Sequence, residues 1–128
     1  LFVLGRASDT FTSKSGEKIY CFDIEAAIRE NKNVADCEVV GIPSNGHDIP
    51  VAHIIVRDKC KLSEDELIAT IHSNCQQKLS MQAVPCGYKI RKNFPVKDSG
   101  KRDIELIKQD RTDFIVPTCN GILHGISF

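Results

Sequence analysis

The sequence predicts an α+β domain in which a small mixed or antiparallel sheet, of about three strands plus an N-terminal hairpin, packs with two to three helices. Two observations lead to this fold class. Short β-branched and apolar runs are interspersed with stretches in which apolar residues recur at helical spacing. The 128 residues, 41% of them hydrophobic, suit one globular core and leave little room for a second.

The N-terminal part begins with extended segments and continues with a helix. Residues 1–4 are apolar and β-like, and the polar stretch 6–16 is a predicted loop or loose hairpin. Residues 18–20 form a short extended piece. The stretch 22–30 predicts a helix, because one of its faces carries the apolar side chains of Ile24, Ala27 and Ile28.

Two strands follow, joined by a short loop. Residues 37–42 read as a strand that ends at Pro43 and a turn-prone Ser-Asn-Gly. Residues 51–56 are β-branched and apolar, as in a central strand. The short connection predicts an antiparallel pair. We expect His53, inside the second strand, at the edge of the core or in solvent.

The clearest helix begins after Ser63, because Glu66 stands at the capping-box spacing. An apolar stripe at helical spacing then follows, formed by Leu67, Ile68, Ile71, Cys75 and Leu79. The alternating stretch 88–92 predicts a half-buried strand. A loop is expected at 93–100 and a short helix at 103–109.

The chain therefore divides into a domain at 1–109 and a tail or extension of unknown role at 110–128. The tail contains a possible strand at 114–116 and a turn signal at 120–121. Its apolar end has no obvious partner. It is an extension, a linker into another module, or a patch that packs on a missing domain.

Charge and composition exclude several classes of function. The chain carries 17 Lys and Arg against 17 Asp and Glu, which argues against a protein that mainly grips nucleic acid. No apolar run approaches the roughly 20 residues needed to span a membrane. The cysteine spacings are wide and predict free thiols in a reducing, cytoplasmic compartment, and the scattered histidines predict no metal site.

Two loops carry side chains suited to an anionic ligand. The first, at 5–16, joins Arg6 to one acidic residue, Asp9, and two glycines, although the residues alone favour a solvated hairpin with a surface ion pair. The second, at 98–101, ends in Gly100-Lys101 just before a predicted helix. Alone, this Ser-Gly-Lys tripeptide is a weak signal, and an exposed turn is the simpler interpretation.

Five stretches stand together in a recognisable order. They are Gly-Arg-Ala-Ser-Asp at 5–9, Ser-Gly-Glu-Lys-Ile with Asp-Ile-Glu at 15–25, Val-Val-Gly-Ile-Pro ending 34–43, Asp-Ile-Pro-Val-Ala at 48–52, and Phe-Pro to Ser-Gly-Lys at 94–101. Together they resemble the C-terminal, mobile domain of the adenylate-forming (AMP-binding) enzymes. This family includes acyl-CoA synthetases, peptide-synthetase adenylation domains and luciferases, and the likeness spans roughly 4–109.

The resemblance implies an ATP-dependent, AMP-forming carboxylate ligase, that is, an acid–thiol ligase of the acyl-CoA synthetase type. Such an enzyme joins a carboxylate to ATP, releases pyrophosphate and leaves an acyl-adenylate. It implies that Lys101 is the catalytic lysine, carried on a closing loop (residues 94–101) that includes Ser99 and Gly100. A positioned ammonium there would stabilise the negative charge where two anions meet.

Further roles follow from the same resemblance. Arg6 would bind the ribose hydroxyls of the nucleotide, and the hinge of a domain rotation would be Ser8 by strict count or its neighbour Asp9. After the rotation, Gly16 would line the channel for the pantetheine arm of the thiol, because a glycine lets a narrow ligand pass close to the backbone.

The implied cofactors are ATP and Mg²⁺, bound mainly by a missing N-terminal adenylation domain of the same enzyme, and CoA or a carrier pantetheine. The isolated domain is not expected to be active, and acyl specificity, the acceptor and the oligomeric state stay open. The alternative is a non-catalytic interaction or regulatory module that retains the fold. Lys101 and Arg6 separate the two hypotheses, since such a module has no need of both.

Overall fold

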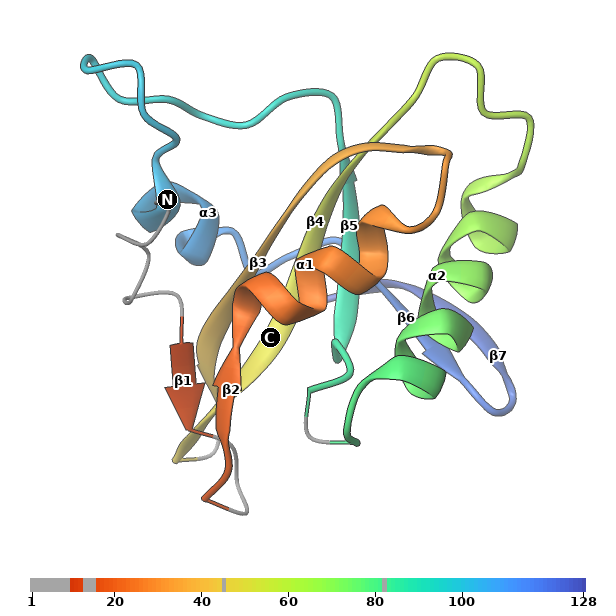
Figure 1. The fold of residues 1–128 in the computed structure, drawn as a ribbon, viewed down its shortest axis with the longest axis horizontal. Coiled ribbons are helices and arrows are strands. Elements are labelled where there is room, and N and C mark those ends of the chain that lie inside the picture. Colours follow the sequence, from red (N-terminus) through yellow and green to blue (C-terminus); the bar gives the residue numbers. More distant parts are fainter. Residues whose placement is uncertain (1–9, 13–15, 45, 82) are drawn as a thin grey trace.

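A computed structural model describes residues 10–12, 16–44, 46–81 and 83–128 of the chain (Figure 1). The predictions for residues 1–9 lie outside the described part of the chain. The elements, in chain order, are β1 (Thr10–Thr12), β2 (Lys18–Tyr20), α1 (Cys21–Arg29), β3 (Val34–Ser44), β4 (His47–Val56), α2 (Glu64–Lys78), β5 (Gly87–Arg91), α3 (Ile104–Gln109), β6 (Phe114–Thr118) and β7 (Gly121–Ile126).

The larger sheet is mixed and has the strand order β3-β4-β5-β6-β7, while β1 and β2 form a separate two-stranded hairpin. Strands β3 and β4 pair antiparallel over their full length, as predicted. Strand β5 pairs parallel to β4, from Val51↔Gly87 to Ile55↔Arg91. Helix α2 makes the crossover that a parallel pair requires. The α+β class is confirmed.

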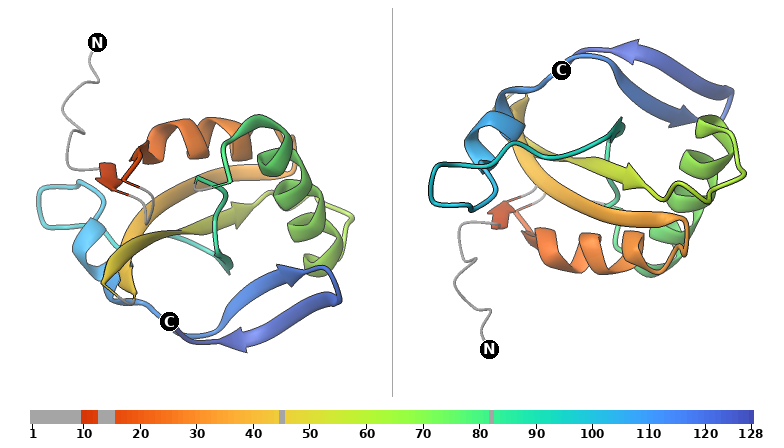
Figure 2. Two further views of the ribbon diagram at one scale, coloured as in Figure 1. Left: turned by 90° about the horizontal axis from the view of Figure 1, so that it is seen from below. Right: turned by 90° about the horizontal axis from the view of Figure 1, so that it is seen from above.

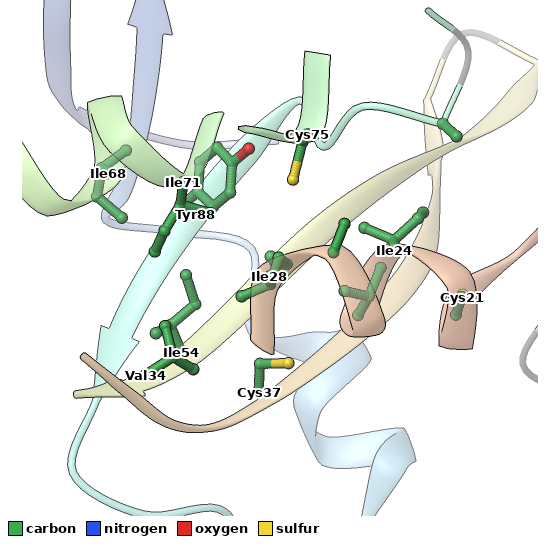
Figure 3. Packing of buried hydrophobic residues seen from close by; sticks show 14 of the residues in the cluster. Cys21, Ile24, Ile28, Val34, Cys37, Ile54, Ile68, Ile71, Cys75 and Tyr88 are labelled. Atoms are coloured by element: carbon green, nitrogen blue, oxygen red, sulfur yellow. The ribbon is translucent and has the colours of Figure 1, made fainter. Parts of the chain in front are cut away.

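The helices α1 and α2 lie on one side of β3 and β4, and the β6–β7 hairpin lies on the other side (Figure 2). Between the helices and the sheet, side chains from both layers point toward one another (Figure 3). This main core includes Ile24 and Ile28 of α1, Ile68, Ile71 and Cys75 of α2, and Val34, Cys37, Ile54 and Tyr88 of the strands. The apolar stripes predicted for the two helices are therefore their buried faces.

A second, smaller core lies on the opposite face of the sheet. It consists of the buried side chains of Val40, Ile42, Val51, Ile107 and Phe114. The ring of Phe128 packs against this core and lies so close to Gly87 that a Cβ there would be 2.8 Å from it. The predicted strand at 114–116 is confirmed within β6, and the tail enlarges the expected three-stranded sheet to five strands.

His53 is fully buried, so the expectation of an exposed or core-edge histidine was wrong. Its ring lies edge-on to Phe114, with 5.4 Å between the ring centroids. Phe114 belongs to β6, a strand whose place in the sheet the sequence did not predict. Because β6 covers this face of β4, it removes His53 from solvent.

All six cysteines are free thiols in the structure. Cys21, Cys37 and Cys75 are buried, and burial raises the pKa of Cys37 to about 12 and that of Cys75 to about 11. Thiolate is the nucleophilic form, so these two side chains act as small hydrophobes in the core. Among the described residues, no helix is both long enough and apolar enough to cross a membrane.

The predicted capping box of α2 is present. Ser63 Oγ accepts a hydrogen bond from the Glu66 amide at 3.2 Å, and the Glu66 carboxylate accepts from the Ser63 amide. We expect Ser63→Ala to lower the free energy of unfolding by about 1 kcal/mol, because the cap satisfies an orphan amide of the first turn. Chemical denaturation measures this loss. Ser73→Ala, at an exposed position within α2, is the control and should leave the stability nearly unchanged.

Candidate functional site

The closing loop connects β5 to α3 and is folded into a tight turn. The Lys97 amide donates to the Lys101 carbonyl at 2.7 Å, and the Gly100 amide donates back to the Lys97 carbonyl at 2.8 Å. Gly100 has φ +87°, a left-handed conformation that side chains other than glycine adopt with strain. The glycine therefore lets the chain reverse immediately before Lys101.

Lys101 is exposed at the end of this turn, as are Ser99 and Gly100. Among the described residues, its ammonium group has no hydrogen-bond or ion-pair partner. Two residues later, Asp103 caps α3 by accepting a hydrogen bond from the Leu106 amide at 3.2 Å. Helix α3 is itself anchored by the fully buried Ile107. Within the described part of the chain, Lys101 is thus an unpaired cation on a short loop that leads into the anchored helix α3.

Gly16 lies just before β2, at a different place in the fold. It is exposed and has φ +91°, and among the described residues no atom lies within 4 Å of a Cβ built on it. A groove of about 370 Å³ begins at the next residue and runs between β2, α1 and the end of α2, lined by Glu17, Lys18, Ile19, Tyr20, Asp23, Ala26, Ala27, Glu30, Lys78, Leu79, Ser80 and Ala83.

The closing loop and the start of β2 lie at opposite ends of the molecule (Figure 1). The structure therefore brings Ser99, Gly100 and Lys101 together and places Gly16 apart from them. The remaining predicted site residues, Arg6, Ser8 and Asp9, lie outside the described residues.

One group of polar residues was missed by the sequence analysis. Arg102, directly after Lys101, contacts two carboxylates of β3, those of Asp36 and Glu38. The sequence did contain a signal for the two carboxylates: Asp36 and Glu38 are two positions apart, and residues i and i+2 of a strand point to the same face. Nothing local to the sequence indicated that Arg102, about 65 positions away, is their partner.

Metal ligands do not gather in the described part of the chain. No group of three or more His, Cys, Asp or Glu side chains there could hold an ion. The described residues thus offer an exposed lysine, an exposed glycine and a groove lined by both charged and apolar side chains.

The sequence pattern of the family described as "AMP-binding enzyme C-terminal domain" matches residues 23–101 of this chain. The chain belongs to this family. The match begins within α1 and ends at Lys101, the last residue of the closing loop. Helix α3 and strands β6 and β7 lie beyond the matched residues.

Curated relatives of the domain are ligases. The crotonobetaine/carnitine–CoA ligase of Escherichia coli O8 (strain IAI1) is 32% identical over 89 residues, which are 69% of this chain and 16% of the relative. The enzyme of the same name from Proteus mirabilis (strain HI4320) is 28% identical over the same shares. The chain therefore spans about one sixth of the length of these relatives.

Solved structures of the family have the same fold. The acyl-CoA synthetase of Brucella canis is 30% identical, with a TM-score of 0.69 over 82% of this chain and 19% of that one. The fatty acyl CoA synthetase of Mycobacterium tuberculosis is 22% identical, with a TM-score of 0.65 over 80% of this chain and 19% of that one. The latter likeness concerns the fold alone.

Proposed function

We propose that this domain serves an ATP-dependent, AMP-forming carboxylate ligase of the acyl-CoA synthetase type, and that Lys101 is its catalytic lysine. One observation carries the proposal. The side chain at the family's closing-loop lysine position is present, exposed and unpaired among the described residues, at the tip of a glycine turn.

The chemistry explains why a free ammonium is useful there. A carboxylate oxygen attacks the α-phosphorus of ATP, the bond from that phosphorus to the bridging oxygen breaks, and pyrophosphate leaves. Two anions must approach each other, and negative charge accumulates on the phosphoryl oxygens in the transition state. An ammonium held beside these oxygens stabilises the transition state more than the separated reactants.

The rest of the reaction requires the large domain. In this proposal ATP, Mg²⁺ and the acyl group have their main binding sites in an N-terminal adenylation domain of the same enzyme, which the 16% share of the curated relatives spanned by this chain supports. In this proposal Arg6 hydrogen-bonds the ribose hydroxyls, since a guanidinium presents paired donors to a diol. The free cysteines fit the expected cytoplasmic compartment.

The second half-reaction transfers the acyl group from the adenylate to the thiol of CoA or of a carrier pantetheine. In the proposed cycle the domain rotates about a hinge at Ser8 or Asp9, withdraws Lys101 and presents Gly16 to the thiol. The separation of the closing loop from the start of β2 (Figure 1) supports this proposal, because a rotation of the domain would let both serve one active site.

The decisive experiment measures ATP-dependent pyrophosphate release by the full-length parent protein with a panel of fatty, aromatic and amino-acid carboxylates. We expect release with one class of carboxylate, followed by thioester formation when CoA or a carrier thiol is added. No release across the panel from a well-folded parent would reject the ligase. It would favour a non-catalytic interaction or regulatory module that has kept the fold.

A further inference from the structure

Arg102 follows the closing loop directly, and its side chain turns away from solvent toward β3. Its Nη2 lies 2.5 Å from Asp36 Oδ2, and its Nη1 lies 2.7 Å from Glu38 Oε1. The Glu38 side chain is completely buried, whereas that of Arg102 is 28% exposed. The two carboxylates thus receive the two arms of one guanidinium, an arrangement that a lysine cannot reproduce.

The same guanidinium also contacts the first residue of the closing loop. The Arg102 Cζ lies 4.3 Å from the centroid of the Phe94 ring, a cation–π contact. Phe94 in turn packs against the smaller core on that face of the sheet. Backbone pairing between Val96 and Arg102 joins the two sides of the loop. Arg102 therefore ties both ends of the closing loop to β3.

Asp36, one of the two carboxylates that Arg102 contacts, is itself held in place. Asp36 Oδ1 accepts hydrogen bonds from Arg29 of α1 and from the Cys37 amide, both at 2.8 Å. Burial by itself would raise the pKa of the Asp36 carboxyl, but these hydrogen bonds and the Arg102 charge outweigh burial and lower it on balance. A lowered pKa keeps Asp36 ionised at neutral pH, and the charge is lost only as the pH falls through that lowered value.

We propose that Arg102 is a positioning residue for adenylation. It holds the backbone of the neighbouring Lys101 in the position and orientation from which the lysine ammonium reaches the reacting anions. This inference rests on the proposed role of Lys101. The lysine stem is long and, among the described residues, its ammonium has no partner. Its reach is therefore set by the backbone at 101, and that backbone is fixed on one side by Arg102. Misplacement of a catalytic group by about 1 Å can cost on the order of 100-fold in rate.

The test compares Arg102→Gln with the unmodified full-length protein in the two half-reactions. We expect kcat for pyrophosphate release to fall about 10- to 100-fold while KM for ATP changes less than about twofold. Thioester formation from a supplied acyl-adenylate should stay unchanged, because Lys101 has no part in that step. Arg102→Lys should recover only part of the lost kcat, since it restores the positive charge but not the two guanidinium nitrogens that contact the two carboxylates.

A second readout does not depend on activity. Hydrogen exchange of the peptide spanning 95–101, measured by mass spectrometry on the full-length protein, should become faster in Arg102→Gln, because the loop loses its tie to β3. Arg57→Gln is the matched control. Arg57 follows β4 and donates to the Lys32 carbonyl at 3.0 Å, so its loss should alter neither the loop nor kcat.

The outcomes separate this inference from the proposed function. If Lys101→Ala abolishes pyrophosphate release but Arg102→Gln leaves kcat unchanged, the positioning role is wrong and the catalytic lysine stands. If Lys101→Ala itself leaves release unchanged, the proposed function is wrong and the positioning role with it. Should Arg102→Gln fail to fold, Arg102→Lys tests the same tie, because a lysine cannot contact Asp36 and Glu38 with two arms at once; unchanged kcat and exchange in that variant would overturn the proposal.

Discussion

In the full-length parent protein, Lys101→Ala should lower the rate of pyrophosphate release about 100- to 1,000-fold, the usual cost of removing one group that stabilises developing charge. The domain should stay folded, because the Lys101 side chain is exposed and the turn that carries it is held by backbone hydrogen bonds and by Gly100. The effect should appear in kcat more than in KM for ATP, since the ammonium acts mainly in the transition state.

Lys97→Ala is the matched control for this variant. Lys97 is a second exposed lysine of the same turn, and it holds the turn through its backbone rather than its side chain. It should keep near-normal activity. The Lys101→Ala enzyme should also form thioester normally from a supplied acyl-adenylate. Equal rates of pyrophosphate release in Lys101→Ala and the unmodified protein would remove the catalytic role from this residue.

His53→Leu should raise the free energy of unfolding by about 1–3 kcal/mol at pH 7, the cost of leaving a buried polar group unsatisfied. Neither ring nitrogen of His53 has a hydrogen-bond partner in the described part of the chain. The side chain is fully buried and contacts the edge of Phe114. Leucine has a suitable volume for this apolar site and brings no unsatisfied nitrogen. Chemical denaturation at pH 7 measures the gain.

The same substitution should change the response to acid. Burial, reinforced by the nearby charges of Arg91 and Lys89 and opposed by Asp110, lowers the pKa of His53 from 6.5 to about 4. Between these two values the unfolded chain binds a proton that the folded chain does not, so the stability falls as the pH falls through this window. The loss amounts to about 3 kcal/mol by pH 4.

Unfolding free energies measured from pH 7 to pH 4.5 test this pH dependence. The slope should be flatter in His53→Leu than in the unmodified chain. Ile54→Val is the control, since it changes the next residue of β4 without removing a titrating group. It should lower the stability by about 0.5–1.5 kcal/mol and leave the slope as it was. Parallel pH profiles for His53→Leu and the unmodified chain would show that His53 is not the acid-sensitive group.

Local signals in the sequence were sufficient for most individual elements. The capping box at Ser63 and the stripe from Leu67 to Cys75 predicted α2, because both depend on residues three or four positions apart. The short connection between β3 and β4 predicted their antiparallel pairing, because strands joined by a short loop must run in opposite directions to pair. The five ordered motifs led to the family, and the matched residues 23–101 confirm it.

The sequence by itself thus determined the α+β class, the family and the lysine at the end of the closing loop. The tertiary structure alone decided which distant residues meet: the pairing of β6 with β5, the burial of His53 beneath Phe114, and the contact of Arg102 with Asp36 and Glu38. Periodicity and capping reflect interactions between residues that are close in the sequence. The contacts named above join distant segments, which meet only when the sheet assembles and water is excluded from both of its faces.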